Sequence, residues 1–323
     1  MTRAIRIHEH GGPEVMRLED VDVGEPGPGE ARVRHAAVGL NFIDTYHRTG
    51  LYPVSLPSGL GMEAAGVIEA VGEGVTELSP GQRVAYAAGP PGAYAEARVV
   101  AADRLVPLPN AVDDEAAAAA MLKGMTVEYL IRRTHRVSAG ETVLLHAAAG
   151  GVGLVACQWL KHLGATVIGT VGSDEKAELA RAHGCDHPIV YTREDFAARV
   201  RELVPGGVPV VYDSVGAATF EASLDCLAPR GLMVSFGNAS GKPPALEVGA
   251  LAQKGSLFLT RPTLMTYVAA RADLLESAAA VFDVIARGAV TIAIGQRFPL
   301  ADAAEAHRAL EDRATTGSTV LIP

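Results

Sequence analysis

The sequence predicts an α/β protein that combines a β-rich domain with a doubly wound parallel sheet. Up to about residue 108, short β-like runs are separated by Gly and Pro. From about residue 141 to 260, apolar strand-like runs alternate with helix-like runs, a pattern typical of a parallel sheet covered by helices. Because 323 residues exceed the usual size of one core, we expect two domains. They are residues 1–123 with 264–323, and residues 124–263.

The composition is that of a folded protein, and the net charge argues against two classes of binding partner. Hydrophobic residues make up 49% and charged residues 20% of the chain. A net charge of −9 argues against binding to nucleic-acid backbones or anionic membranes, which require clustered Lys and Arg. We find neither a membrane-length apolar run nor a signal peptide, and expect a cytoplasmic protein. The isolated cysteines Cys157, Cys185 and Cys226 are expected to be packing residues.

The β-rich part contains strand-like runs and one helix start. Acidic residues 113–115 follow two prolines and open a helix through 116–120, where carboxylates complement the helix dipole. After residue 260 we expect a long Ala-rich helix at 264–287 and a shorter helix at 301–310. The expected strands of this part are residues 31–38, 66–71, 82–86, 94–100, 291–294 and 319–322.

The second part alternates strand and helix. In its first helix, apolar residues recur at i, i+3, i+4, i+7, i+8 and i+11 from Val152, and Gly164 is placed to end the helix as a left-handed cap. His146, at the end of a buried strand, is expected to be a hydrogen-bonded core histidine. The expected strands are 142–145, 166–171, 189–191, 208–212, 232–236 and 256–259, and the helices are 152–163, 174–183, 196–204 and 219–227.

A glycine loop follows the first of these strands. Ala148, Gly150 and Gly153 match the pattern G-x-G-x-x-G with Ala in the first place. Gly150 permits close approach of a pyrophosphate, and Gly153 permits close packing of the helix on the strand. Because the loop joins a strand to an amphipathic helix, it predicts dinucleotide binding through Gly150, Gly151, Val152 and Gly153. The alternative is a turn that only packs helix on strand.

The end of the second strand bears on the choice of dinucleotide. An NAD site usually has an Asp or Glu there for the ribose, and this strand ends without one. Ser173, Lys176 and Tyr191 are all placed to surround a 2′-phosphate, which favours NADPH over NADH. In the alternative, Lys176 is an ordinary solvated lysine. Asp174 and Glu175 are expected to complement the helix dipole and point to solvent.

Four residues follow the carboxyl ends of later strands, where open α/β sheets bind ligands. They are Ser214, Phe236, Gly237 and Asn238. We expect them to contribute to the same dinucleotide site.

The whole chain resembles the zinc-free quinone oxidoreductases, the zeta-crystallin-like branch of the medium-chain dehydrogenase/reductase superfamily. The resemblance implies a GroES-like catalytic domain interrupted by a Rossmann domain, and a homodimer. Its most specific segments are 39–46 (GLNFIDTY), 56–66 (LPSGLGMEAAG), 148–153, 212–216 (YDSVG) and 316–318 (TGS).

The residues at two positions argue against a metal. Zinc enzymes of this superfamily carry a catalytic Cys where this chain has Asn41, and G-H-E where it has Gly-Met-Glu at 61–63. We therefore expect no metal. Without a Lewis acid, the chemistry suits acceptors that take hydride or electrons readily, such as quinones and α,β-unsaturated carbonyls.

The resemblance also implies roles for individual residues. Asn41 lies against the nicotinamide, and Tyr46 and Tyr52 line a substrate cleft between the domains, where a phenol orients or protonates a carbonyl oxygen. In the alternative, both tyrosines are packed amphipathic residues. We expect His47 to be solvated or hydrogen-bonded. The remaining expected site residues are Thr126, Phe258 and Ser318 for the cofactor, and Arg261 for the substrate or for a surface ion pair.

Together these observations predict an NADPH-dependent quinone reductase without zinc, which holds the nicotinamide against a flat acceptor. One alternative is an NADPH-dependent reductase of 2-alkenals or enones on the same scaffold. Another is a largely non-catalytic protein that binds nucleotides or single-stranded RNA, although the net charge argues against RNA.

Overall fold

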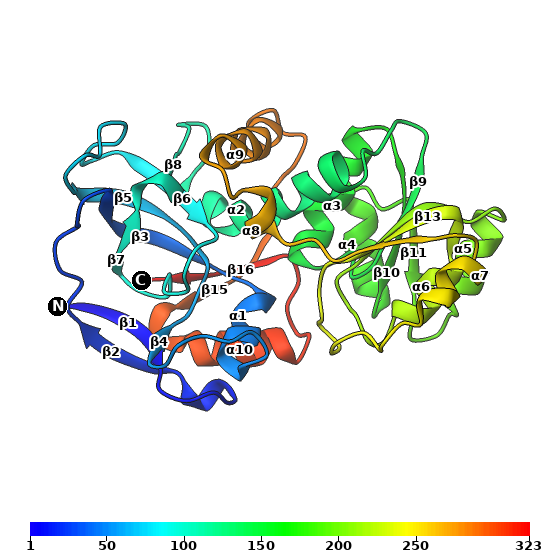
Figure 1. Ribbon diagram of the computed structural model, residues 1–323, viewed down its shortest axis with the longest axis horizontal. Coiled ribbons are helices and arrows are strands. Elements are labelled where there is room, and N and C mark those ends of the chain that lie inside the picture. Colours follow the sequence, from blue (N-terminus) through cyan, green and yellow to red (C-terminus); the bar gives the residue numbers. More distant parts are fainter. The chain divides into compact units, whose positions relative to one another are not determined.

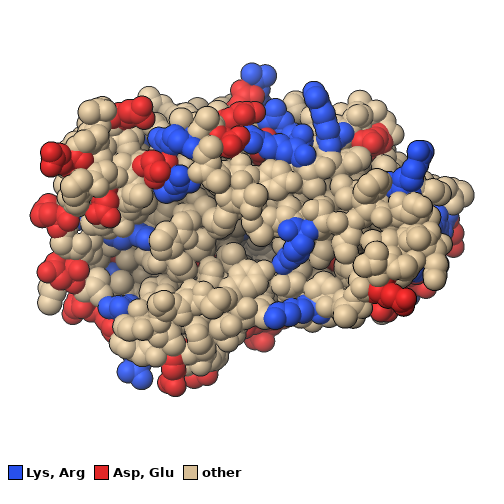
Figure 2. All heavy atoms as spheres, in the orientation of Figure 1, with Lys and Arg blue, Asp and Glu red and all other residues tan.

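The structure, a computed structural model, describes residues 1–323 as two compact units (Figure 1). Unit 1 comprises Met1–Met125, Tyr267–Arg287 and Ile292–Pro323. Unit 2 comprises Thr126–Thr266 and Gly288–Thr291. No helix is long and apolar enough to span a membrane. On the face shown in Figure 2, acidic side chains gather at the left edge of the view, over unit 1.

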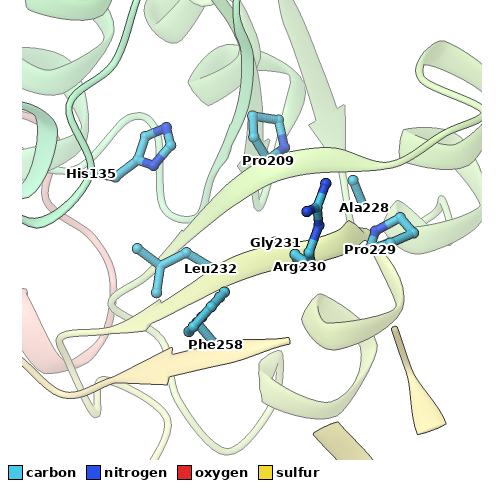
Figure 3. Close-up of a pocket in the computed structure, with 8 residues that line it drawn as sticks. All are labelled: His135, Pro209, Ala228, Pro229, Arg230, Gly231, Leu232 and Phe258. Carbon is cyan, nitrogen blue, oxygen red and sulfur yellow. The ribbon is translucent and has the colours of Figure 1, made fainter. Parts of the chain in front are cut away.

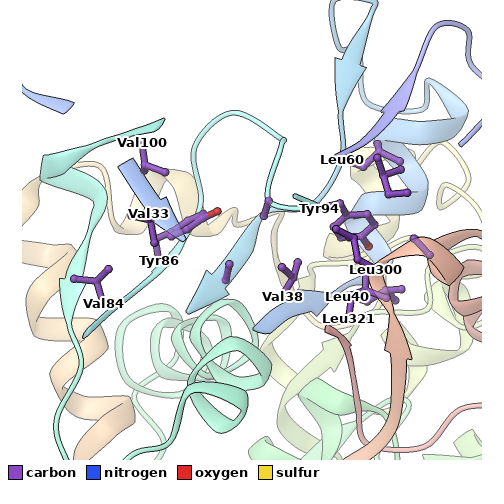
Figure 4. Packing of buried hydrophobic residues seen from close by; sticks show 14 of the residues in the cluster. Val33, Val38, Leu40, Leu60, Val84, Tyr86, Tyr94, Val100, Leu300 and Leu321 are labelled. Carbon is purple, nitrogen blue, oxygen red and sulfur yellow. The ribbon is translucent and has the colours of Figure 1, made fainter. Parts of the chain in front are cut away.

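Unit 1 is built on two sheets. Its strands are β1 (Thr2–Ile7), β2 (Arg17–Val21), β3 (Glu30–Leu40), β4 (Ser58–Gly59), β5 (Glu63–Val71), β6 (Arg83–Ala87), β7 (Ala97–Ala101), β8 (Val106–Pro107), β15 (Ile294–Pro299) and β16 (Ser318–Ile322). A seven-stranded sheet has the order β15-β16-β3-β5-β6-β8, with β7 also paired to β3, and a smaller sheet has the order β2-β1-β4. Side chains of these strands form an apolar core (Figure 4) that includes Val33, Val38, Leu40 and Tyr86, together with Tyr94 from the segment between β6 and β7.

Helices pack on these sheets and position the residues discussed below. They are α1 (Phe42–Thr49), α2 (Asp114–Tyr129, which continues into unit 2), α8 (Leu264–Tyr267, at the boundary), α9 (Arg271–Ala286) and α10 (Ala303–Glu311), with short 3-10 turns at Pro13–Val15, Ala102–Arg104 and Leu300–Asp302. Asp113 Oδ1 accepts a hydrogen bond from the amide of Ala116, so the predicted acidic helix start is confirmed.

The long helix expected at 264–287 is wrong, because the chain leaves the helix between α8 and α9. The guanidinium of Arg104 donates to the carbonyls of Val268 and Ala269 at 3.2 and 3.1 Å. These carbonyls are therefore bonded by a distant side chain instead of by helical amides. Ala-rich composition could not reveal that tertiary contact.

Unit 2 is a six-stranded parallel sheet with flanking helices. Its strands are β9 (Thr142–Leu145), β10 (Thr166–Val171), β11 (His187–Val190), β12 (Val208–Asp213), β13 (Leu227–Ser235) and β14 (Phe258–Thr260), and its helices are α3 (Gly151–His162), α4 (Asp174–Ala182), α5 (Phe196–Leu203), α6 (Phe220–Asp225) and α7 (Val248–Gln253), with a π-helical turn at Leu130–Thr134. The strand order is β11-β10-β9-β12-β13-β14, so the chain adds strands on one side of β9 up to β11 and then on the other side from β12 onwards. Doubly wound sheets bind ligands at such a switch point, here between β9 and β12.

Most predicted elements of unit 2 are confirmed, with one clear error. The helix expected at 219–227 ends at Asp225, and β13 begins at Leu227, five residues before the expected strand. Leu227 pairs with Val208 before a register shift, and Arg230 has a left-handed φ of 63°. Because of this irregularity and a proline at 229, the sequence pattern does not predict the first half of β13.

Three smaller predictions are also confirmed in unit 2. Gly164 follows α3 with a φ of +81° and caps it. His146 is buried, and its two ring nitrogens lie 2.8 Å from the hydroxyls of Thr170 and Ser223. All three cysteines are buried and free.

Candidate functional site

The glycine loop of unit 2 is shaped by close backbone contacts. Gly150 is the extended N-cap of α3, and a Cβ there would lie 3.3 Å from the Ala147 oxygen. A Cβ on Gly153 would lie 2.3 Å from the same oxygen, so only glycine fits without moving the loop. Gly151 and Val152 form the first turn of the helix, whose amides have no partner within the helix. The loop therefore presents donors for an anion.

The three residues predicted to hold a 2′-phosphate belong to neighbouring segments. Ser173 is the N-cap of α4, and its Oγ accepts from the amide of Lys176 at 3.3 Å. Tyr191 follows β11, and its hydroxyl lies 3.2 Å from the place that a Cβ of Gly172 would occupy. The structure thus brings the Tyr191 phenol to the turn that carries Ser173.

The same turn contains an ion pair that the sequence analysis missed. Arg193 binds both carboxylate oxygens of Asp174 at 2.5 and 2.6 Å, and it holds the pKa of Asp174 below its usual range. Asp174 and Glu175 are exposed as expected, and a hydrogen bond from Ser173 lowers the pKa of Glu175. The spacing of Arg193 from Asp174 carries no sequence signal, because the two meet only across the ends of neighbouring strands.

Further predicted residues gather at the carboxyl ends of β12 and β13. A Cβ on Gly237 would lie 2.3 Å from the Ser214 oxygen, so these two segments touch backbone to backbone. Phe236 and Asn238 flank Gly237. Arg261, which follows β14, donates to the carbonyl of Ser235 at 2.7 Å.

Phe258 is placed differently. It begins β14, is 61% exposed, and lines a surface cavity of about 430 Å³ together with residues 228–232 of β13 (Figure 3). His135 and Pro209 complete this cavity. The cavity is at the amino-terminal half of β13, so Phe258 is separated along the sheet from the carboxyl-end residues, and its cofactor role stays a prediction.

The predicted residues of unit 1 lie on and beside α1. Asn41 is the N-cap of this helix and forms a capping box with Asp44. Tyr46 is 8% exposed, and its ring meets the ring of Tyr52 edge to face at 5.1 Å. The amide of Tyr52 also donates to the Tyr46 carbonyl at 3.0 Å. The two phenols therefore form one pair.

The expectation of a solvated or hydrogen-bonded His47 is not met at Nδ1. The residue is 8% exposed, and Nδ1 has no hydrogen-bond partner. Its place in the last turn of α1 packs the ring near Tyr52, with ring centroids 6.1 Å apart. Burial lowers the pKa of His47, so the neutral ring is favoured.

Two further residues have been assigned to the cofactor by resemblance. Thr126 is buried on α2. Ser318 is buried at the start of β16, where its hydroxyl donates to the carbonyl of Ala119 at 3.2 Å.

A buried polar network in unit 1 was not foreseen. Asp44 Oδ2 accepts from the amide of Asn41 and the hydroxyl of Tyr94, each at 2.9 Å. The Tyr94 oxygen lies 3.1 Å from His307 Nε2, and His307 Nδ1 lies 2.9 Å from Arg48 Nη1. The network joins residues more than 250 positions apart, which no local sequence pattern encodes.

Burial sets the protonation of this network. It raises the pKa of Asp44 to about 7, whereas the hydrogen bonds from Asn41 and Tyr94 act in the opposite direction. Burial, assisted by the charge of Arg48, lowers the pKa of His307 to about 3. A neutral histidine therefore lies beside a carboxyl group that titrates near neutral pH. The structure contains no group of three or more His, Cys, Asp or Glu that could hold a metal ion.

Comparisons with known proteins agree with this architecture. A model of the "Alcohol dehydrogenase GroES-like domain" matches residues 27–110, and a model described as "Zinc-binding dehydrogenase" matches residues 151–282. The quinone oxidoreductase of Pseudomonas aeruginosa is 57% identical over 325 residues, covering 100% of both chains. A 2-haloacrylate reductase from Burkholderia is 47% identical over 331 residues, covering 100% of this chain and 99% of the relative.

Solved structures show the same relationship. The Escherichia coli quinone oxidoreductase complexed with NADPH has a TM-score of 0.98 and 50% identity, covering 99% of this chain and 100% of that chain. The quinone oxidoreductase of Pseudomonas syringae pv. Tomato has a TM-score of 0.98 and 52% identity, covering both chains completely. Unit 1 accordingly contains a GroES-like domain and unit 2 a Rossmann domain. On these matches, the chain belongs to the quinone oxidoreductase family of the medium-chain dehydrogenase/reductase superfamily.

Proposed function

We propose that this protein reduces quinones with NADPH and does so without zinc. The observation that carries the proposal is the grouping of Ser173, Lys176 and Tyr191 around a strand end without a carboxylate. Beside it lies a glycine loop in which position 153 has no room for a Cβ. Relatives at 50–57% identity that are named quinone oxidoreductases support the same assignment.

The residues of unit 2 fit a bound dinucleotide. The first-turn amides of α3 and the close backbone approach that Gly150 permits suit a pyrophosphate. The Lys176 ammonium, the Ser173 hydroxyl and the Tyr191 phenol suit a 2′-phosphate, while Arg193 neutralises the neighbouring Asp174. We assign Ser214, Phe236, Gly237 and Asn238 to the same cofactor, with Thr126, Ser318 and Arg261 as further contacts.

The chemistry assigned to unit 1 concerns positioning and a proton. Bound NADPH supplies the hydride, so a quinone needs one further proton to leave as the hydroquinone. We assign the Tyr46 phenol to orient the acceptor oxygen and pass it that proton, with Tyr52 supporting the ring of Tyr46. Asn41 is assigned to the nicotinamide. Tyr46→Phe is expected to lower kcat about ten-fold or more, and more than Tyr52→Phe does.

The test of the function is the initial rate of NADPH oxidation with an ortho-quinone, after treatment of the protein with a chelator. We expect turnover that survives chelation and exceeds the rate with NADH. The 2-haloacrylate reductase at 47% identity favours a second candidate, an enone or 2-alkenal reductase. Turnover of a 2-alkenal with no turnover of the quinone selects that candidate, and no turnover with either acceptor refutes both.

Lys176→Ala tests the cofactor assignment. Loss of a charge-assisted hydrogen bond to phosphate is expected to raise the KM for NADPH roughly ten-fold or more. The KM for NADH should change little. Lys161→Ala is the matched control, because Lys161 pairs with Asp186 at the amino-terminal end of β10, away from Ser173 and Lys176. It should leave both constants unchanged. Equal effects of Lys176→Ala on NADPH and NADH would contradict the 2′-phosphate assignment.

We also propose that the protein forms a homodimer in the cytoplasm. β14 is the edge strand of the unit 2 sheet, with Phe258 and Leu259 61% and 39% exposed, and a second copy is the partner that would cover such an edge. Sedimentation of the wild type and Phe258→Glu tests this. We expect a dimer and a monomer, respectively. An unchanged mass combined with a raised KM for NADPH would instead favour the predicted cofactor role of Phe258.

A further inference from the structure

A buried ion pair in unit 1 has no part in the function proposed so far. Lys123 Nζ lies 3.0 Å from Glu63 Oε1, and the two side chains are 6% and 0% exposed. Removing two charges from water is costly and is offset only by good geometry and further hydrogen bonds. A buried ion pair is therefore weak evidence of stability, and a specific positioning role must be sought in its contacts.

The carboxylate of Glu63 is fully engaged by donors. Oε1 accepts from the Lys123 ammonium and from Asn41 Nδ2 at 2.8 Å, and Oε2 accepts from the amide of Leu122 at 2.5 Å. The Lys123 ammonium and the Leu122 amide can only donate, so both carboxylate oxygens of Glu63 act as acceptors. The same logic fixes the Asn41 amide, because only its nitrogen can face a carboxylate.

The ammonium has a second anchor next to Asn41. Lys123 Nζ donates to the carbonyl of Leu40, the residue that immediately precedes Asn41, at 3.2 Å. The Lys123 ammonium is thus bonded both to the main chain just before Asn41 and to the Glu63 carboxylate, which in turn holds the Asn41 side chain.

The space for this arrangement is built into the backbone. A Cβ on Gly39 would lie 2.2 Å from Glu63 Oε1 and 2.1 Å from the carbonyl oxygen of Ala118 on α2. Gly39 and Glu63 are paired residues of β3 and β5. The Glu63 carboxylate therefore occupies space that a side chain at position 39 would need.

We propose that Lys123 and Glu63 are positioning residues for hydride transfer, which fix the amide of Asn41 and the start of α1, the helix that carries Tyr46. The inference rests on the proposed function, in which Asn41 contacts the nicotinamide. Asn41 heads α1, so a shift of its main chain moves the helix as well. A misplacement of about 1 Å at reacting groups can cost on the order of 100-fold in rate, although neither residue touches the reacting atoms.

The kinetic test uses a variant that removes both charges. Lys123→Met alone leaves a buried carboxylate unpaired and is expected to unfold easily, whereas the double variant Lys123→Met with Glu63→Gln removes both charges of the pair. For the double variant we expect kcat to fall about 10- to 100-fold, with the KM for NADPH within two-fold of wild type. The primary isotope effect with 4-deuterated NADPH should rise, because mispositioned hydride transfer becomes more rate-limiting.

The matched control is Glu128→Gln. Glu128 is also a buried carboxylate on α2, 1% exposed and 3.1 Å from Arg133. It is expected to lose stability without any change in kcat or in the isotope effect. A folded double variant with wild-type kcat and isotope effect would overturn the proposal, as would equal losses in the Glu128→Gln control.

A second readout does not depend on activity. The chain has three asparagines, so labelling with ¹⁵N-asparagine gives three side-chain amide pairs in an NMR spectrum. The Asn41 pair is identified by its loss in Asn41→Ser. We expect it to exchange slowly with solvent in the wild type and to shift and exchange faster in the double variant, but not in Glu128→Gln. If the Asn41 amide signals of the double variant match those of the wild type, the positioning role of Lys123 and Glu63 is refuted. This outcome does not depend on whether the wild type reduces quinones, so the two proposals fail separately.

Discussion

Asp44→Asn is expected to remove a specific pH dependence of stability. The carboxyl group is completely buried, and its Oδ1 has no hydrogen-bond partner. The ordinary pKa of 3.8 applies when the chain is unfolded, and burial raises it to about 7 in the fold. Asparagine has the shape of the protonated acid and cannot ionise, so the substitution replaces the titrating group with its neutral form.

The sign of the effect follows from proton binding. Between pH 4 and 7 the folded Asp44 holds a proton that the unfolded chain has lost, so the free energy of unfolding falls as the pH rises, by up to about 1.4 kcal/mol per pH unit. The contribution is fully present below about pH 4 and is lost above about pH 7. Across roughly three units, the sum reaches at most about 4 kcal/mol.

The assay is urea unfolding of the wild type and Asp44→Asn at pH 5, 6, 7 and 8. His35 and His307, whose pKa values burial lowers to about 4 and about 3, titrate in both proteins and cancel in the difference. We expect the Asp44→Asn variant to gain stability relative to wild type at each step towards pH 7, and no further change above it. Parallel stability curves for the two proteins would refute the reasoning.

Two other substitutions test packing. Gly153→Ala places a methyl group 2.3 Å from the Ala147 oxygen, and overpacking should cost about 1–3 kcal/mol and weaken NADPH binding. Thermal melting and titration of NADPH fluorescence measure both effects. Arg48→Met breaks an ion pair between the buried Arg48 and Glu311 and should lower the free energy of unfolding by about 2–3 kcal/mol. This is less than the ~3–5 kcal/mol for a fully buried pair, because Glu311 is 33% exposed. The substitution should also raise the pKa of His307, which NMR titration of the ring follows, since the Arg48 charge helps to hold that pKa low.

The parallel-sheet unit was predictable because its signals are local. The apolar stripe from Val152 and the cap at Gly164 are fixed by sequence spacing alone, and both are confirmed. The residues expected around a 2′-phosphate follow two strands that the alternation already predicts. Errors occurred where a distant group decides the local structure, as when Arg104 interrupts the helix expected from the Ala-rich segment after residue 264.

The polar interior of unit 1 could not be predicted in the same way. Glu63 and Lys123 lie 60 positions apart and meet only because β5 and α2 are neighbours in the fold. The sequence gives Glu63 no partner, and it predicts of His47 only that the side chain is solvated or hydrogen-bonded. Which polar residues are buried, and which partners they find, depends on tertiary packing and not on periodicity.

The hydrogen-bond directions in the Asp44 network explain where its proton must reside. Arg48 can only donate, so His307 Nδ1 accepts from it and the neutral ring carries its hydrogen on Nε2. That hydrogen points to the Tyr94 oxygen, which leaves the Tyr94 hydroxyl hydrogen for Asp44 Oδ2. Oδ2 therefore receives hydrogens from both Tyr94 and the amide of Asn41, and a proton on Asp44 has to sit on Oδ1. Because burial disfavours the charged form and Oδ1 accepts no hydrogen bond, the acid form persists to higher pH. Arg48→Met removes the donor that fixes this direction and so weakens the hydrogen bond from Tyr94 that lowers the pKa of Asp44. In an Arg48→Met background the pKa of Asp44 should therefore rise further, and the pH-dependent difference caused by Asp44→Asn should become larger.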